Sequence, residues 1–253
     1  MLKKEFSIFF TAMMFFTRFP CPKWIDHSPE ILNKSSKYFS LVGIIVGSFG
    51  ALTYWMISFI LPINISLFLS MIATIWITGA FHEDGFADVC DGFGGGFTKE
   101  KILTIMKDSR LGTYGTIGLL GMLATKYLAL SAFPNELIIT LIAGHSISRF
   151  ISTILLYLYP YVRDDLTSKA KPMANALKVS SLIINGIIGL LPLFFYNSLW
   201  IFLAIIPPFI SMLFMGRFFK KWIGGQTGDC AGATQQIAEV VFYLSILVLW
   251  KFI

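Results

Sequence analysis

Three aspartates, Asp84, Asp88 and Asp91, follow an apolar run in the segment HEDGFADVCDGFGGG. Their i, i+4, i+7 spacing would place them on one helix face, within about 60° of one another at roughly 100° per residue. Like charges at this spacing destabilise a bare helix. A divalent cation would compensate them, because hard cations prefer oxygen ligands. The spacing predicts a metal-binding helix, and the alternative is a solvated acidic helix start.

The residues beside the aspartates limit the kind of site. Gly85 allows another backbone to approach closely near the start of the helix. The D-x-D-x-D-G spacing of an EF-hand is absent, and Phe86 stands where an HExxH zinc motif needs its second histidine. The glycine-rich run 92–96 can present backbone N–H groups to phosphate oxygens, or it can be a flexible turn between two helices.

A second charged cluster, Lys107-Asp108-Ser109-Arg110, follows an amphipathic helix expected near 98–107. Asp108 could be a fourth metal ligand or a base. Arg110 could clamp a phosphate through its planar guanidinium. The alternative is a juxtamembrane ion pair with an ordinary loop arginine, and this cluster alone does not decide between the two.

Small residues surround a further aspartate, Asp229, in the segment 224–229 (GGQTGD). Small residues permit tight packing against another helix or a ligand. Asp229 stands where a helix should begin, so it either joins the acidic site or caps that helix. Glu239 follows inside an apolar run, where a carboxylate is costly and usually functional.

Two cations, Lys126 and Arg149, lie within apolar runs. Both should face the interior of a helix bundle, where carboxylates or phosphates would compensate them. His145 lies one turn before Arg149 on the same face. The alternative to phosphate binding is structural pairing with Glu239 or with backbone carbonyls.

The composition indicates a polytopic membrane protein. Of the 253 residues, 56% are hydrophobic and 13% are charged, whereas soluble domains are about a quarter charged. Apolar runs of about 20 residues recur along the chain. Residues 1–253 are therefore expected to form one all-α integral membrane domain. The net charge of +6 does not indicate nucleic acid, because the cations lie in short segments between apolar runs.

The elements expected from these runs are six membrane spans, with a seventh near 235–252. Residues 5–20 are expected to form a retained amphiphilic helix, because Arg18 and Pro20 end its apolar stretch and no small-residue cleavage site follows. Three widely separated cysteines predict free thiols. The six spans are 38–61, 64–82, 112–133, 137–158, 179–196 and 199–218.

Charge is distributed unequally between the connecting segments. Segments 1–37, 83–111, 159–178 and 217–234 contain 17 of the 20 cations. The short turns at 62–64, 134–136 and 196–198 contain no lysine or arginine. By the positive-inside rule this predicts a cytoplasmic N-terminus, cytoplasmic large loops and chemistry at the cytoplasmic face of a cell (inner) membrane.

Several of these motifs together resemble the cobalamin synthase family of adenosylcobinamide-GDP ribazoletransferases. Lys126 and Arg149 also stand at positions that look like family positions. Glu83 occupies a variable position and ranks below the aspartates. The matching motifs, which extend over nearly the whole chain, are Phe16–Pro22, His82–Gly92, Met106–Gly115, Gly224–Asp229 and Glu239.

The resemblance implies a transferase of the late nucleotide-loop assembly of vitamin B12. Adenosylcobinamide-GDP would be joined to α-ribazole, or to its 5′-phosphate, with release of GMP and a requirement for Mg²⁺. A ribose hydroxyl would attack the phosphate on the cobinamide arm. The base could be one of the aspartates, or the substrate phosphate could make one unnecessary. The partners implied are these substrates and the lipid bilayer, with homo-oligomerisation left open.

The site residues expected on these grounds fall into three sets. The catalytic set is Asp84, Asp88, Asp91, Asp108, Arg110 and Asp229. The substrate-binding set is Lys126, Arg149, His82, Gly225, Thr227 and Glu239. The metal ligands are Asp84, Asp88, Asp91 and Asp108, with Asp229 as an alternative to Asp108.

Two other classes share some of these features. A secondary transporter also carries intramembrane charges, but here the charges concentrate at one face and no repeat halves are visible. A CDP-alcohol phosphotransferase has a similar acidic signature, but that class shows an Ala-Arg pair where this chain has Ala87-Asp88. Release of GMP rather than CMP would separate the classes.

Overall fold

The computed structural model describes residues 2–22, 24–25, 28–133, 136–163 and 177–252. Within these ranges no strand occurs beyond one isolated parallel bridge between Tyr161 and Gln226, so the predicted all-α class is confirmed. Part of the predicted turn at 134–136 and most of the loop 159–178 lie outside the described residues. The helices are α1 (Leu2–Phe16), α2 (Pro29–Ser35), η1 (Ser36–Tyr38), α3 (Phe39–Ser58), α4 (Ile63–Thr78), α5 (Phe81–Gly95), α6 (Lys99–Ile105), α7 (Thr113–Ser131), α8 (Leu137–Leu158), α10 (Val179–Leu190), η2 (Leu191–Phe195), η3 (Leu199–Ile205), α11 (Ile206–Ile223) and α12 (Gly228–Leu249).

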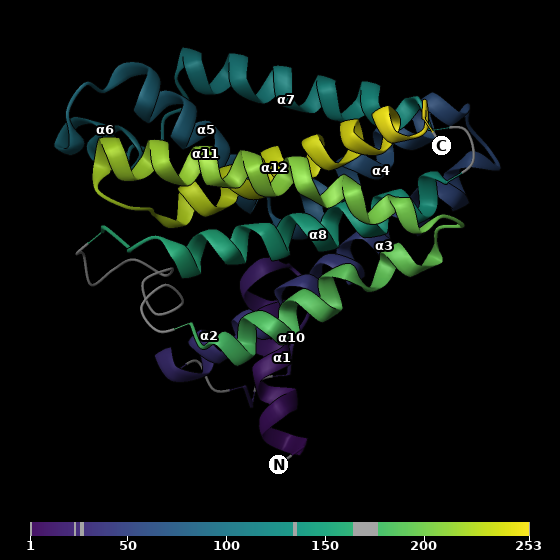
Figure 1. Ribbon diagram of the computed structural model, residues 1–253, viewed down its shortest axis with the longest axis horizontal. Helices are drawn as coiled ribbons and strands as arrows, with labels where there is room; N and C mark the ends of the chain where they lie inside the picture. The colour runs from purple at the N-terminus through teal and green to yellow at the C-terminus, as the bar shows by residue number, and fades with distance from the viewer. Residues whose placement is uncertain (1, 23, 26–27, 134–135, 164–176, 253) are drawn as a thin grey trace.

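The long helices run side by side as a bundle, with α8 and α12 at its centre (Figure 1). Helix α8 packs against α3, α10, α11 and α12, and α12 packs against α5, α7, α8 and α11. Helices α5 and α6 lie together at one end of the bundle, beside the last turns of α11 (Figure 1). This end therefore gathers the segments that contain the predicted acidic residues.

Among the residues that the structure describes, four helical stretches are long and apolar enough to cross a membrane: 30–58, 137–158, 199–223 and 228–249. The bent pair α4–α5 would make a fifth, and the shorter apolar stretch 179–195 covers α10 and η2. A helical membrane bundle is thus supported, whereas the predicted count of six or seven spans is not confirmed. The last span begins at Gly228, earlier than predicted, because Thr227 caps it.

A sharp corner separates α4 from α5. Gly79 and Ala80 both adopt left-handed backbone conformations, with φ of 68° and 57°, and the two helix axes meet at 88°. Glycine adopts this region readily, whereas alanine does so at a cost of about 1–2 kcal/mol. The corner thus turns α5 nearly perpendicular to α4.

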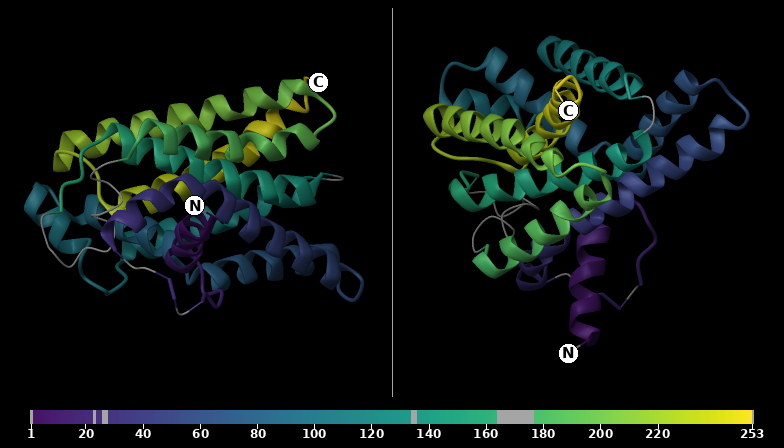
Figure 2. Two further views of the ribbon diagram at one scale, coloured as in Figure 1. Left: turned by 90° about the horizontal axis from the view of Figure 1, so that it is seen from below. Right: turned by 45° about the vertical axis from the view of Figure 1, so that its right-hand side comes forward.

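Helix α1 lies crosswise to the long helices (Figures 1 and 2). Its last residue, Phe16, packs on Phe39 with ring centroids 4.4 Å apart and stacks on His82 at 5.7 Å. The predicted N-terminal helix is confirmed, and these contacts attach it to the start of α3 and of α5.

Candidate active site

Helices α5 and α12 cross in close contact at Gly85 and Asp229. A Cβ atom on Gly85 would lie 3.0 Å from the Cα atom of Asp229 and 3.1 Å from its carbonyl oxygen. Only glycine leaves room for this approach, as the sequence predicted. The crossing places Asp88 near Asp229, with Asp84 exposed beside them. We refer to Asp84, Asp88 and Asp229 as the acid cluster.

The acid cluster carries more negative charge than its surroundings compensate. Partial burial, and after it the carboxylates of Asp229 and Asp84, raise the pKa of Asp88 to about 7. The Arg163 guanidinium opposes this effect. Because each like charge disfavours ionisation of its neighbour, the cluster favours an additional cation.

Arg163, which the sequence analysis treated only as a loop cation, lies against this cluster. Its Nη2 atom is 2.7 Å from Oδ2 of Asp229 and donates to the carbonyl oxygen of Met106 at 3.1 Å. Its buried Nε atom has no partner among the described residues. No spacing in the sequence marks Arg163, because only tertiary structure brings it to Asp229.

The glycine-rich segment before α12 positions Arg163. The N–H of Gln226 donates to Pro160 O at 2.8 Å, and the N–H of Val162 donates to Gln226 O at 3.0 Å. A Cβ atom on Gly225 would lie 2.1 Å from the same carbonyl oxygen of Pro160. Gly225 is thus explained by backbone packing, and its predicted substrate contact remains a prediction.

Thr227, and not Asp229, is the N-cap of α12. The Thr227 hydroxyl accepts from Cys230 N at 3.3 Å. Asp229 lies in the first helical turn with its carboxylate on Arg163. The interpretation of Asp229 as a cap is therefore wrong, and Thr227 has a structural role beside its predicted substrate role.

Asp91 caps another helix. Its Oδ2 atom accepts from Gly112 N at 2.7 Å and its Oδ1 atom accepts from Gly115 N at 2.8 Å, at the start of α7. Free N–H groups and the helix dipole both favour a carboxylate there. The prediction that the three aspartates lie on one helix is confirmed. The Asp91 carboxylate, however, points to α7, and its role as a metal ligand remains a prediction.

Asp108 and Arg110 form a local ion pair on the surface. Arg110 Nη2 lies 2.6 Å from Asp108 Oδ2, and Arg110 is 87% exposed. Hydrogen bonds from Arg110 hold the pKa of the Asp108 carboxyl at about 2. This is the ion pair that the sequence analysis gave as an alternative, and the catalytic and metal roles of both residues remain predictions.

The glycine run continues α5 rather than forming a turn. Helix α5 extends to Gly95. Cβ atoms on Gly92 and Gly94 would lie 2.5 Å from the side chains of Met106 and Tyr114, respectively. The run therefore lets the end of α5 pack against its neighbours. The flexible-turn interpretation is wrong, and phosphate binding by this run is untested.

A second set of charges is buried within the bundle. Lys126 Nζ lies 2.5 Å from Glu239 Oε1, and the side chains are 2% and 0% exposed. Glu239 also accepts from Tyr243 OH at 2.9 Å and from Gln235 Nε2 at 2.8 Å. We call this set, together with Arg149, His145, Glu83 and Gln236, the buried ion network. Lys126 thus forms the structural pair that the sequence analysis weighed against phosphate binding.

Arg149 and Glu83 complete the buried ion network. Arg149 Nη1 donates to the backbone carbonyl of His145 at 2.9 Å. Gln236 Nε2 donates to Glu83 Oε1 at 3.0 Å. The low ranking of Glu83 therefore missed a buried carboxylate that links α5 to α12. The signal in the sequence was the pair Gln235 and Gln236, two polar residues inside the apolar run of α12 that require polar partners from another helix.

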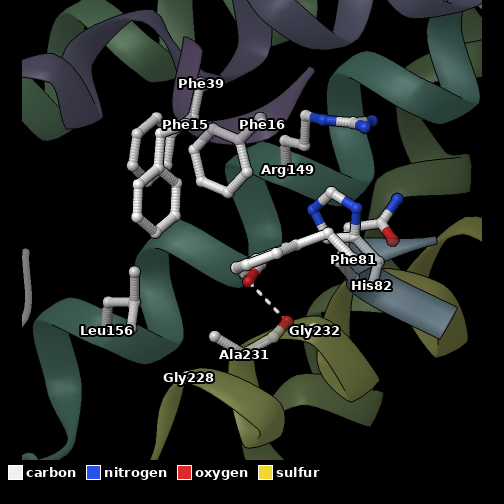
Figure 3. A pocket seen from close by; sticks show the side chains of 12 residues that line it. Phe15, Phe16, Phe39, Phe81, His82, Arg149, Leu156, Gly228, Ala231 and Gly232 are labelled. Atoms are coloured by element: carbon white, nitrogen blue, oxygen red, sulfur yellow. Dashed lines mark hydrogen bonds between the residues drawn. The ribbon is translucent and has the colours of Figure 1, made fainter. Parts of the chain in front are cut away.

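A cavity opens beside the network, and His82 lies in its wall (Figure 3). The rings of Phe15, Phe16 and Phe81 line it, with Arg149 at the same end as His82. At the other side the small residues of α12 form the wall, beginning with Gly228. The predicted substrate residues His82 and Arg149 thus share one cavity.

The predicted metal ligands are not assembled as a set. Within the described part of the chain, no three His, Cys, Asp or Glu side chains are close enough to hold a metal ion. The acid cluster nevertheless offers the oxygen donors that Mg²⁺ prefers. Mg²⁺ commonly takes one or two carboxylates and completes its shell with water and substrate phosphates, so these donors fit that ion.

Comparisons with known proteins agree over nearly the full length. The family model described as cobalamin-5-phosphate synthase matches residues 8–247. An adenosylcobinamide-GDP ribazoletransferase of Shewanella frigidimarina is 45% identical over 249 residues, which cover 96% of this chain and 95% of the relative. A relative of the same name from Shewanella amazonensis is 42% identical over 256 residues, covering 98% of each. No solved structure matches.

Proposed function

Because this chain belongs to the cobalamin-5-phosphate synthase family and is a transferase of cobalamin biosynthesis, we propose that it joins adenosylcobinamide-GDP to α-ribazole or its 5′-phosphate. The observation that supports this most is the contact of α5 with α12. That contact sets Asp88 beside Asp229, with Arg163 paired to the latter at 2.7 Å. Carboxylates and an arginine at one point are the groups that phosphoryl transfer needs.

The proposed reaction is an in-line displacement at phosphorus. A ribose hydroxyl oxygen of ribazole forms a bond to the phosphorus attached to the cobinamide arm. The bond from that phosphorus to the oxygen of GMP breaks, and GMP leaves with the electron pair. The hydroxyl proton passes to a carboxylate of the acid cluster or to solvent.

We assign Asp88 and Asp229 to holding Mg²⁺, with Asp84 at the exposed rim. When bound, Mg²⁺ would neutralise pyrophosphate charge and favour in-line geometry. Arg163 is within reach of the same point, because it already contacts Asp229. Its planar guanidinium suits two phosphate oxygens. Arg163 would therefore orient the substrate phosphate.

The site is proposed to face the cytoplasm from a cell (inner) membrane. Helices α5 and α6 lie at one end of the bundle, beside the last turns of α11 (Figure 1). Helix α6 carries Lys99 and Lys101, and the last turn of α11 carries Lys220 and Lys221. Cytoplasmic loops carry an excess of lysine and arginine. Accessibility of a cysteine introduced at Lys101 to a membrane-impermeant reagent, in cells and in inverted vesicles, tests this orientation.

Purified protein in detergent, given adenosylcobinamide-GDP and α-ribazole, should release GMP only when Mg²⁺ is present. Asp229→Asn should lower the rate about 10²-fold or more, because it weakens the hold on the metal and on Arg163. Thr116→Val, at an exposed position on α7, is the matched control. Full Mg²⁺-dependent turnover by Asp229→Asn, or release of CMP from a CDP-alcohol, would contradict the proposal.

A further inference from the structure

The cavity beside His82 has an apolar end and a polar end. Phe15 and Leu156 lie at the apolar end, and the ring of Phe81 extends towards them (Figure 3). His82 and Arg149 lie at the opposite end (Figure 3). The wall formed by α12 is lined mostly by small residues, among them Gly228 and Gly232. Aromatic rings on one side and small residues on the other suit an aromatic ligand, which can pack against those rings.

The polar end holds groups without partners. The imidazole of His82 stacks on Phe16 with an interplanar angle of 10° and makes no hydrogen bond to a described residue. Arg149 is 3% exposed, and its Nε atom has no partner among the described residues. Buried polar groups are normally hydrogen-bonded. A ligand that fills the cavity should therefore present a hydrogen-bonding atom at this end.

The cavity adjoins the acid cluster. Gly228 lines the cavity and is followed in the chain by Asp229, which pairs with Arg163. Gly232 packs against His82 on the other side, where an added Cβ atom would lie 3.3 Å from the His82 carbonyl oxygen. A ring bound in the cavity would thus have its substituent directed past Gly228 to the site of phosphoryl transfer.

We propose that this cavity binds the planar nitrogen heterocycle of the acceptor substrate, the base of ribazole, with a ring nitrogen at His82. The inference rests on the proposed function, because that function supplies the acceptor. The base stacks among Phe15, Phe16 and Phe81, and its ribose extends to the acid cluster. A lipid chain would fill the apolar end but would leave the His82 imidazole and the Nε atom of Arg149 without a hydrogen bond, which is unfavourable.

Two probes of the same shape test the polar end. 1-Methylbenzimidazole has one acceptor ring nitrogen, and 1-methylindole has none. Both are titrated calorimetrically into the full-length protein without Mg²⁺ or nucleotide substrate. The benzimidazole should bind about tenfold more tightly, since an unmet hydrogen bond at a polar site is costly. Equal affinity for both probes, or binding of neither, would overturn the proposal, and equal affinity would indicate a lipid-type apolar site.

Variants locate the probe in this cavity. Phe81→Leu should weaken 1-methylbenzimidazole about tenfold through lost stacking, and His82→Phe should abolish the preference for it over 1-methylindole. Phe68→Leu, at a position 52% exposed on α4, is the matched control and should change neither value. Thermal unfolding monitors folding, and if His82→Phe fails to fold, Phe81→Leu decides. Unchanged binding by Phe81→Leu would overturn the assignment.

Turnover separates this inference from the proposed function. Phe81→Leu should raise the KM for ribazole about tenfold and leave the KM for adenosylcobinamide-GDP within twofold. Normal GMP release with an unchanged KM for ribazole would overturn the cavity assignment while the proposed function stands. Absence of GMP release from the unmodified protein would overturn the proposed function, whereas probe binding would still report on the cavity.

Discussion

The acid cluster and the buried ion network use the same residue types in opposite ways. In the network, Glu239 contacts Lys126, Tyr243 and Gln235 and is fully buried. In the acid cluster, Arg163 pairs with Asp229 and acts on Asp88, and no cation contact is described for Asp84. The network is neutralised by the chain itself, whereas the cluster retains negative charge at an open surface. We therefore expect a cation or a ligand to bind at the acid cluster, and we expect the buried ion network to stabilise the fold.

Breaking the network should give the largest loss of stability. Lys126→Met leaves Glu239 buried without its cation and should destabilise the protein by about 3–5 kcal/mol. Thermal unfolding in detergent measures this effect. The double variant Lys126→Met/Glu239→Gln should lose less than the sum of the single variants. Lys101→Met, at an exposed position on α6, is the control and should change the unfolding temperature little. If Lys126→Met changed it equally little, the proposed difference between the two regions would be wrong.

Removing a charge from the acid cluster should have the opposite effect on stability. Asp88→Asn removes a carboxylate that Asp229 and Asp84 repel, so Mg²⁺-free protein should unfold at the same or a higher temperature. Mg²⁺-dependent GMP release should fall about 10²-fold. Such a trade between stability and activity is typical of functional sites. A fall in unfolding temperature comparable to that of Lys126→Met would contradict this expectation, and Glu100→Gln serves as the exposed control.

Arg163 partly neutralises the acid cluster, as Lys126 neutralises Glu239 in the buried ion network. Arg163→Gln should lower the unfolding temperature of Mg²⁺-free protein by about 2–4 °C, which corresponds to about 1 kcal/mol. Added Mg²⁺ should restore more stability to this variant than to the unmodified protein, because ligand binding stabilises the folded state. Arg217→Gln, at an exposed position on α11, controls for loss of charge. Equal Mg²⁺ shifts in all three proteins would argue against Mg²⁺ binding at Asp229.

Asp91 belongs to neither region and should have the smallest effect on Mg²⁺-dependent turnover. Asp91→Asn weakens a helix cap and should cost about 1 kcal/mol. The Mg²⁺ concentration for half-maximal turnover should stay within twofold. A tenfold increase in that concentration would instead show that Asp91 is a ligand, as the spacing of the three aspartates predicted.

The sequence was informative where local pattern determines structure. Apolar runs located the long helices, and the aspartate spacing predicted the helix that became α5. Gly85 was correctly expected at a close backbone approach, because no other residue removes the Cβ atom. The family resemblance was likewise carried by ordered motifs that persist along the chain.

The remaining features depend on tertiary contacts. Arg163 reaches Asp229 only because residues 160–162 pair with Gln226. Asp91 shares a helical face with Asp88, yet the neighbouring start of α7 supplies N–H groups that draw it away. Helical periodicity predicts which residues share a face, but it does not predict which neighbour that face meets.

The ion pair between Lys126 and Glu239 also constrains how the chain is made. Lys126 lies on α7, whereas Glu239 lies on α12, which is synthesised later. The sequence predicts a membrane span at 112–133, and a lysine at the centre of an inserting helix costs about 2.5–3.5 kcal/mol. In that span Lys126 would have no carboxylate partner until α12 emerges. Chains truncated before Gly228 should therefore insert α7 less efficiently than complete chains, which glycosylation-site mapping would measure. Stable insertion of α7 would thus depend on α12.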